Sequence, residues 1–163
     1  MRVLELYVPG SEAEWLRSFR FALEVRPRFC EVDGLGHVSN TVYPTYWELA
    51  RLRYLAAVGE ADDSPVRTFP FNHMAVEIAF RMLAPCFYDE ALLVHARVAG
   101  LGTSSLTMEH ALSAAETGAV RAIARIVVVA SDGDHGIPWT AGQRARLEAF
   151  EGCSFGRPAI GSR

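Results

Sequence analysis

Three polar residues follow one another in the stretch EVDGLGHVSN, residues 31–40, at a spacing that could serve one reaction. Asp33 lies in a glycine-rich turn, His37 follows it, and Asn40 stands where a helix is predicted to begin. A carboxylate can attack a carbonyl carbon directly or act as a general base on water. The unpaired N–H groups and the dipole at a helix start can stabilise negative charge on the carbonyl oxygen. Asp33, His37 and the backbone N–H of Asn40 are therefore the candidate catalytic groups.

Each of these residues also has a purely structural interpretation. Asp33 can bond its own backbone in the turn, which requires no catalytic role. His37 is equally suited to a turn or to the wall of a site, where it would bond a substrate or orient Asp33. Asn40 as a helix cap is compatible with catalysis, because the stabilising group would be its backbone N–H. Glu48 is interpreted as structural, paired with Arg51 or with a partner chain.

The segments on either side of the turn predict a strand and a buried helix. Residues 18–30 alternate between apolar and charged side chains, as a half-buried strand does, and Pro27 favours an edge position or a bulge. Residues 41–58 predict a helix that is apolar almost all round, so cover from a second subunit is plausible. The predicted inward face of the strand holds Phe21, Leu23, Val25 and Phe29, and the predicted polar side of the helix holds Glu48, Arg51 and Leu55.

Four strand-like runs follow the helix, and the short turns between them favour an antiparallel meander. Thr140 and Gln143 have capping-box spacing and predict a short helix over residues 141–150. One buried helix among these strands requires a sheet that curls around it, which is an α+β layout. The four runs are residues 71–83, 91–100, 105–114 and 120–130.

Composition narrows the possible classes of function. The chain has 163 residues, half of them hydrophobic, and a net charge of −3, which suits one globular domain. No basic block is present, so nucleic-acid or anionic-membrane binding has little support. The N-terminus has no long apolar stretch, and we expect neither a signal peptide nor a membrane span. Three scattered cysteines favour reduced thiols in the cytoplasm over disulfides or a metal framework.

The spacing of turn, cap and helix residues resembles a known family. The pattern F-x-E-x-D-x-x-G-H-V-x-N-x-x-Y-x-x-Y-x-E-x-A-R, from Phe29 to Arg51, is similar to that of the hotdog-fold thioesterases of the 4-hydroxybenzoyl-CoA thioesterase group, which includes bacterial acyl-CoA thioesterases. The resemblance covers residues 18–150. It leaves residues 1–17 as an N-terminal appendage and residues 151–163 as a flexible tail.

This resemblance implies a curled five-stranded antiparallel sheet around a long central helix, extended edge to edge in a homodimer and often paired into a homotetramer. The active sites lie between subunits. Asp33 holds the position of the catalytic carboxylate, and the backbone N–H of Asn40 that of the group polarising the thioester carbonyl. The implied substrate is an acyl-CoA or an acyl-carrier-protein thioester, with no metal and no cofactor beyond the substrate's own CoA. The predicted substrate contacts are Thr41, Tyr43, Thr103 and Ser104.

Thioester hydrolysis needs few catalytic groups. The leaving group is a thiol, whose pKa is about 8.5 for a free cysteine, so the thiolate departs without a general acid. One carboxylate and one oxyanion site then suffice, with Asp33 as either nucleophile or base. Many bacterial acyl-CoA members carry histidine at the position of Asn40, whereas here His37 stands three residues earlier.

Two other functions are weighed against hydrolysis. A hydratase or dehydratase of hydroxyacyl thioesters on the same fold would use a histidine with a helix carboxylate, for which only His37 and Glu48 qualify, at a spacing that looks too short. A non-catalytic acyl-thioester binding protein would lack the carboxylate, and Asp33 is present.

Overall fold

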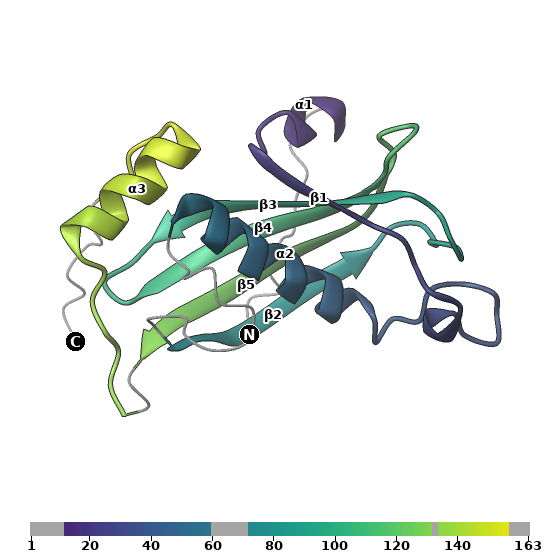
Figure 1. Ribbon diagram of the computed structural model, residues 1–163, viewed down its shortest axis with the longest axis horizontal. Coiled ribbons are helices and arrows are strands. Elements are labelled where there is room, and N and C mark those ends of the chain that lie inside the picture. The colour runs from purple at the N-terminus through teal and green to yellow at the C-terminus, as the bar shows by residue number, and fades with distance from the viewer. Residues whose placement is uncertain (1–11, 60–71, 132–133, 157–163) are drawn as a thin grey trace.

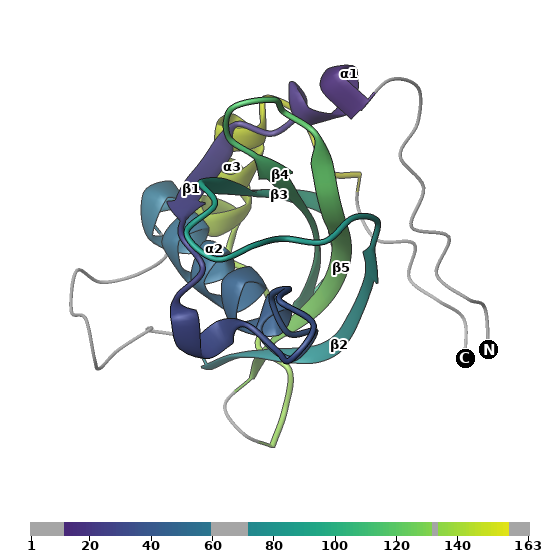
Figure 2. The ribbon, with the colours of Figure 1, turned by 90° about the vertical axis from the view of Figure 1, so that its right-hand side faces the viewer.

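The computed structural model describes residues 12–59, 72–131 and 134–156. Five antiparallel strands form one sheet in the order β1-β3-β4-β5-β2, which curls around the central helix α2 (Figures 1 and 2). This confirms the predicted α+β hotdog architecture. The strands are β1 (Phe21–Val25), β2 (Asn72–Met82), β3 (Leu92–Leu101), β4 (Ser105–Ala114) and β5 (Val120–Ser131), and the helices are α1 (Glu12–Leu16), the 3-10 turn η1 (Phe29–Glu31), α2 (Tyr43–Val58) and α3 (Ala141–Glu151).

The meander prediction holds for three strands and fails for the fourth. β3, β4 and β5 are consecutive neighbours, but β2 pairs with β5 at the far edge instead of with β3. Between β1 and β2 the chain forms α2 on the inner face of the sheet (Figure 2), where Tyr43 at the start of the helix stacks on Phe80 of β2 and Tyr54 near its end meets Phe21 of β1. The strands before and after the helix, β1 and β2, are the two edges of the sheet. β1 is the other edge strand, as Pro27 indicated.

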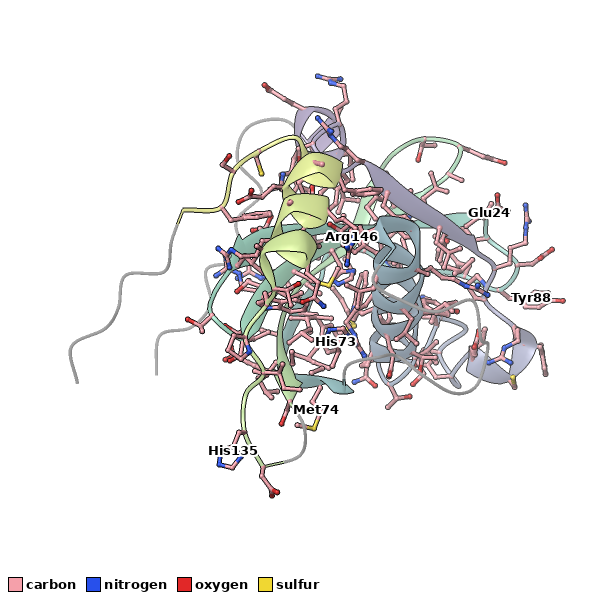
Figure 3. All side chains as sticks on the ribbon, turned by 60° about the vertical axis from the view of Figure 1, so that its left-hand side comes forward. Glu24, His73, Met74, Tyr88, His135 and Arg146 are labelled. Atoms are coloured by element: carbon pink, nitrogen blue, oxygen red, sulfur yellow. The ribbon has the colours of Figure 1, made fainter. Side chains whose placement is uncertain are left out.

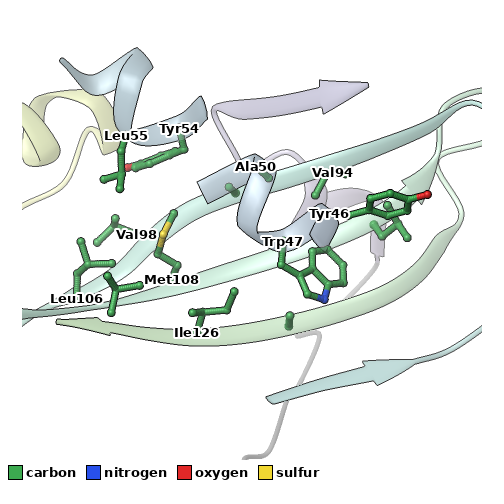
Figure 4. Close-up of a cluster of buried hydrophobic side chains, with 14 of the residues drawn as sticks. Tyr46, Trp47, Ala50, Tyr54, Leu55, Val94, Val98, Leu106, Met108 and Ile126 are labelled. Carbon is green, nitrogen blue, oxygen red and sulfur yellow. The ribbon is translucent and has the colours of Figure 1, made fainter. Parts of the chain in front are cut away.

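The core lies between α2 and the inner face of the sheet. Trp47 and Ala50 of α2 are fully buried and meet Val94 of β3 and Ile126 of β5, which are equally closed (Figure 4). The predicted polar side of the helix was wrong in part. Arg51 and Leu55 are buried, because that side of α2 faces inward. The side that faces solvent holds Thr45, Glu48, Leu49, Arg53, Ala56 and Ala57.

The predicted strand is shorter than its alternation suggested. Regular pairing ends at Val25, and Phe29 begins the 3-10 turn η1 with 82% of its surface exposed, so its predicted inward position was wrong. The alternation of apolar and charged residues continues past Val25 because Pro27 and its neighbours stay extended, although they form no hydrogen bonds with a neighbouring strand. At the other end of the chain, the capping box of Thr140 and Gln143 is present at the start of α3.

The short helix α1 covers part of the outer face of the sheet. Trp15 and Phe19 pack there against Ala111, Val120 and Ile123. Residues 1–11 and 157–163 lie outside the described residues, and the predicted boundaries at residues 17 and 150 stay predictions. Within the ranges that the structure describes, no helix is long and apolar enough to cross a membrane. The three cysteines are free, with Cys86 buried.

The inner face of β2 is open in the protomer. Ile78 lies directly opposite Ile126, and Met82 opposite Ala122, so these side chains share the face that holds the core. Yet Ile78 is 45% and Met82 49% exposed, whereas their partners on β5 are buried. The helix therefore covers β5, and Phe80 of β2 through Tyr43, but leaves the apolar side chains of Ile78 and Met82 about half exposed.

One histidine is part of the core. His110 on β4 is fully buried beneath Trp47, with ring centroids 5.7 Å apart. Burial and the positive charge of Arg51 lower the pKa of His110 to about 3, so the ring is neutral at pH 7.

This histidine makes the fold sensitive to acid. In the unfolded chain His110 binds a proton below about pH 6.5, whereas in the folded chain it stays neutral down to about pH 3. The free energy of unfolding therefore falls as the pH falls from 6.5 to 3. We expect a loss of about 2 kcal/mol between pH 7.5 and pH 5 from this group. Urea unfolding of wild type and His110→Leu at both pH values measures it. Equal losses in the two proteins would contradict the prediction, and His135→Leu, at an exposed site, is the control.

Candidate active site

The turn that carries Asp33 is built by its own backbone. The N–H of Asp33 donates to the carbonyl of His37 at 2.8 Å, and the N–H of Gly36 donates to the carbonyl of Asp33 at 3.0 Å. Gly36 has φ +81°, a left-handed conformation that favours glycine. The N–H of Leu35 donates to Oδ1 of Asp33 at 2.8 Å. The structural interpretation of Asp33 as a turn residue is therefore correct, and the exposed carboxylate keeps Oδ2 available for chemistry.

A buried carboxylate, Glu31, ties this turn to the central helix. Its side chain accepts hydrogen bonds from the hydroxyl of Tyr46 at 2.8 Å and from the Arg28 guanidinium at 2.6 and 3.0 Å. Its backbone carbonyl accepts from the N–H of Ser39 at 2.8 Å. Burial raises the pKa of Glu31, but the bonds from Arg28 and Tyr46 outweigh burial and the net shift is downward. Glu31 thus stays ionised and fixes both ends of the turn.

The helix begins later than the sequence predicted. Its first residue is Tyr43, with Val42 at the N-cap, so Asn40 is not the cap and residues 40–42 form a turn. Ser39 makes the capping contacts, because its carbonyl accepts from Val42 N–H at 3.0 Å and its Oγ lies 3.5 Å from Thr41 N. Pro44 in the first turn favours the late start, since it needs no hydrogen bond there.

The N–H of Asn40 is left available by this arrangement. Within the described part of the chain it donates to no acceptor, and Asn40 is exposed. It lies one residue beyond Ser39, whose own N–H is held by Glu31. The geometry thus keeps the expected oxyanion donor free, although the reason is the turn rather than a cap.

His37, Thr41 and Tyr43 lie near the start of α2. His37 is half-buried and packs edge-on against Phe87, with ring centroids 5.4 Å apart. Tyr43 is buried and stacks on Phe80 of β2 at 6.2 Å. The N–H of Val38 donates to the carbonyl of Cys86 at 2.9 Å, which holds the turn against the segment that carries Phe87. Four of the predicted residues, with Asn40, therefore gather at one end of α2.

Thr103 and Ser104 do not join them. They lie in the turn before β4, whereas the Asp33 turn lies at the other end of the sheet (Figure 1). The ten residues of β4 span about 30 Å at roughly 3.3 Å per residue. The Ser104 carbonyl accepts from Ala130 N–H, and that of Thr103 accepts from Trp139 N–H. Within one protomer these two residues are remote from Asp33.

An exposed aromatic rim flanks the turn. Phe29 and Tyr88 meet edge-on at 6.1 Å, and Tyr88 projects into solvent (Figure 3). Leu35 at the tip of the turn is 81% exposed. Sequence reasoning did not assign a role to Glu31 or Tyr46, although both belong to the pattern from Phe29 to Arg51. The hydrogen bond between them joins positions 15 residues apart. The only signal for it in the sequence is that both positions belong to the same spaced pattern. In the ranges described, no group of three or more His, Cys, Asp or Glu could hold a metal ion.

Comparisons with known proteins show which family the chain and its fold resemble. A family model described as the thioesterase-like superfamily matches residues 27–150. A thioesterase from Thermus thermophilus, solved in complex with coenzyme A and Zn, is 32% identical; the match covers 83% of this chain and 96% of that one, with a TM-score of 0.72. A thioesterase-superfamily protein from a Jannaschia species is 29% identical, covering 88% and 94%, with a TM-score of 0.73.

A curated protein also matches, with lower identity and over a shorter part of the chain. An acyl-acyl carrier protein thioesterase of Arabidopsis thaliana chloroplasts is 26% identical over 88 residues. The match covers 54% of this chain and 46% of that protein, so the chain matches about half the length of this relative.

The anchoring role of Glu31 leads to a testable expectation. In Glu31→Gln the charge-assisted bonds from Arg28 weaken, and we expect a loss of about 1–3 kcal/mol in the free energy of unfolding. We also expect faster amide hydrogen exchange at Asp33 and Ser39, because the turn is released from α2. Glu24→Gln, whose ion pair with Arg26 is half exposed, is the matched control. Unchanged exchange at Asp33 and Ser39 would show that Glu31 does not hold the turn.

Proposed function

Because the chain belongs to the thioesterase-like superfamily, we propose that it hydrolyses acyl-CoA thioesters to a free acid and a thiol. The observation that carries this proposal is the turn that presents the exposed Asp33 carboxylate and, seven residues later in the sequence, the unbonded N–H of Asn40. Hydrogen bonds from Asp33 N–H to the His37 carbonyl and from Ser39 N–H to the Glu31 carbonyl close this turn. The similarity to a thioesterase complexed with coenzyme A supports CoA as the thiol. The exposed free thiols of Cys30 and Cys153 support a reducing, cytoplasmic location.

Two routes use this geometry. In the first, Oδ2 of Asp33 attacks the thioester carbonyl, the C–S bond breaks, thiolate leaves, and water then hydrolyses the acyl-aspartyl anhydride. In the second, Asp33 removes a proton from water, and the resulting hydroxide attacks. Both pass through an oxyanion that the Asn40 N–H stabilises, assisted by the start of α2. His37, three residues before Asn40, packs against Phe87 and is the third group that we assign to this site.

A second copy of the chain completes the site in our proposal. β2 is an edge strand with unpaired backbone groups, and Met74 and Val76 are 47% and 58% exposed along it. On this strand His73 points inward and Met74 outward (Figure 3). Antiparallel pairing of β2 with its copy reverses the second protomer, which brings its Thr103 and Ser104 to the end of the dimer sheet that holds Asp33. Thr103 and Ser104 are far from Asp33 of their own protomer but would lie near Asp33 of the partner.

No contact between His37 and Glu48 among the described residues supports the hydratase alternative. The exposed Glu48 carboxylate lies 3.4 Å from the Arg51 guanidinium, while His37 packs on Phe87. Hydrolysis therefore remains the reaction that we propose, and the binding-protein alternative is separated from it by turnover.

Replacing the carboxylate tests the catalytic assignment. In Asp33→Asn we expect kcat on acyl-CoA esters to fall at least about a hundredfold, because an amide neither attacks nor takes a proton. The side-chain oxygen still accepts the Leu35 N–H, so the fold is retained. Release of thiol from short-chain, long-chain and aromatic acyl-CoAs is the measurement. Unchanged turnover would remove Asp33 from the mechanism, and no turnover by folded wild type on any ester would favour a carrier-protein substrate or a binding role.

An oxygen label separates the two routes. In a single turnover in H₂¹⁸O with excess enzyme, the anhydride route is expected to leave ¹⁸O in Asp33 when water attacks the aspartyl carbonyl, whereas the base route puts the label only into the product acid. Mass spectrometry of the peptide that contains Asp33 is the measurement. Attack of water on the acyl carbonyl of the anhydride would label the acid instead, so trapping with hydroxylamine serves as the second readout.

The proposed dimer is tested at its edge. A charge placed by Val76→Glu is expected to convert a dimer into a monomer and to reduce turnover at least about tenfold, because the site loses its second half. Light scattering after size exclusion gives the mass. Ala22→Glu puts the same charge on β1, the opposite edge, and is expected to leave the dimer intact. A wild-type monomer with full activity would rule the shared site out.

A further inference from the structure

One residue, Arg121 of β5, holds both ends of the connection between β2 and β3. At the first end its backbone carbonyl accepts from the N–H groups of Leu83 and Ala84, at 2.7 and 3.1 Å. At the other end its guanidinium donates to Oε1 of Glu90 at 2.7 Å. The two side chains of this ion pair are mostly buried, with 24% and 18% of their surfaces exposed. The connection, residues 83–91, is therefore fixed to β5 at two points.

Glu90 extends this anchor to the turn that precedes it. Its Oε2 accepts from the N–H of Phe87 at 3.1 Å, and its own N–H donates to the Phe87 carbonyl at 3.3 Å. Asp89 in this turn has φ +58°, a left-handed conformation that costs a non-glycine residue free energy. The N–H of Asp89 donates to the Pro27 carbonyl at 3.1 Å, just beyond the end of β1. Such a turn keeps its shape only while its contacts hold it.

The same turn contacts the candidate active site at two adjacent residues. The ring of Phe87 packs edge-on against His37, with ring centroids 5.4 Å apart. The carbonyl of Cys86 accepts from the N–H of Val38 at 2.9 Å. The connection between β2 and β3 thus holds His37 through its side chain and Val38 through its backbone.

The Asn40 N–H lies just beyond these anchors in the sequence. The N–H of Val38 is bonded to the Cys86 carbonyl. The N–H of Ser39 is bonded to the Glu31 carbonyl, on a different segment of the chain. Because each peptide unit is planar, the direction of an N–H follows from the residues before it. Loss of the anchor at Val38 would therefore free the orientation of the expected oxyanion donor.

The ion pair of Arg121 and Glu90 also lies near the start of α2. Burial, a hydrogen bond with Cys86 and the charge of Glu90 raise the pKa of the Tyr43 hydroxyl, whereas the charge of Arg121 lowers it. A largely buried ion pair adds little net stability, because the removal of two charges from water offsets their attraction. The larger effect of this pair is then on the geometry that the connection adopts.

We propose that Arg121 and Glu90 are positioning residues of the reaction site. Through the turn of residues 86–90 they keep His37 and the Asn40 N–H in the orientation that attack on the thioester requires. This inference rests on the proposed function and adds to it two residues that touch neither the substrate nor the reacting atoms. No bond is made or broken at either residue.

Kinetics of one variant and its matched control test the proposal. Arg121→Met removes the guanidinium and keeps the backbone bonds of that residue. We expect kcat on acyl-CoA esters to fall about tenfold or more while KM changes less than about twofold, because the groups that act in the transition state lose their orientation. Arg121→Lys retains the charge and is expected to retain most of the wild-type kcat.

The matched control is Arg97→Met. The ion pair of Arg97 with Glu109 has the same 2.7 Å distance and a similar exposure, 25% and 20%. It lies between β3 and β4, where the Arg97 guanidinium stacks over the ring of Phe19, next to α1. This variant is expected to leave kcat at the wild-type value, although it loses an ion pair of the same kind.

Nuclear magnetic resonance reports the positioning without turnover. In Arg121→Met the Val38 N–H is expected to exchange with solvent about tenfold or more faster than in wild type, because the Cys86 carbonyl is no longer held. The ring protons of His37 are also expected to shift, since the ring current of Phe87 acts on them. Neither change is expected in the control. If Arg121→Met does not fold, Glu90→Gln is the second variant and is expected to give the same results.

The two readouts separate this inference from the proposed reaction. Faster exchange at Val38 with no hydrolysis by folded wild type would retain the coupling between ion pair and turn and reject the reaction. Hydrolysis with an unchanged kcat in Arg121→Met would reject the positioning role. A fall in kcat without either spectroscopic change would reject it too. Equal losses of kcat in Arg121→Met and Arg97→Met would also reject it, because the ion pair would then act only through global stability.

Discussion

A single helix packed against a five-stranded sheet sets the limits on everything else in this protein. An α-helix with its side chains is about 10–12 Å across, whereas five strands at about 4.8 Å spacing span roughly 19 Å. One helix can cover that width only if the sheet curls around it, and even then one side stays open. Here α2 packs against the β1, β3 and β4 side, and Trp47 reaches towards β5 (Figure 4). On β2 the helix covers Phe80 through Tyr43, but Ile78 and Met82 stay about half exposed. The exposed part of β2 is thus a consequence of geometry, and the proposed dimer forms at this edge.

The same helix also organises the candidate reaction site, but through a polar contact. The Tyr46 hydroxyl on the first turn of α2 donates to Glu31, and Glu31 holds Arg28 and the Ser39 N–H in addition. A carboxylate that is buried must be paired, and this one is paired with groups on both sides of the turn. The Asp33 turn is therefore attached to the buried central helix. This explains how an exposed loop residue can be held in one position relative to Asn40.

Polar groups in the interior fall into two kinds. Glu31, and the Glu151 carboxylate that accepts from Tyr54 and from Val98 N–H, are fully engaged with neighbours and stabilise the packing of helix on sheet. Trp47 Nε1 and the ring of His110 are buried without such neighbours among the described residues. The first kind explains the architecture. The second kind lies at the centre of the packed core, where the rings of Trp47 and His110 are in contact.

The sequence by itself determined the order of elements, the family resemblance and the gathering of Asp33, His37 and Asn40, because these depend on local periodicity and on residues within ten positions of one another. It also indicated β1 as an edge strand through Pro27. Only the tertiary structure decided the place of β2, the burial of Arg51 and Leu55, and the exposure of Phe29. Each of these depends on which face meets the helix, and a repeat of hydrophobic residues does not encode that. The separation of Thr103 and Ser104 from Asp33 has the same origin, since the direction of β4 in the sheet places them at its far end.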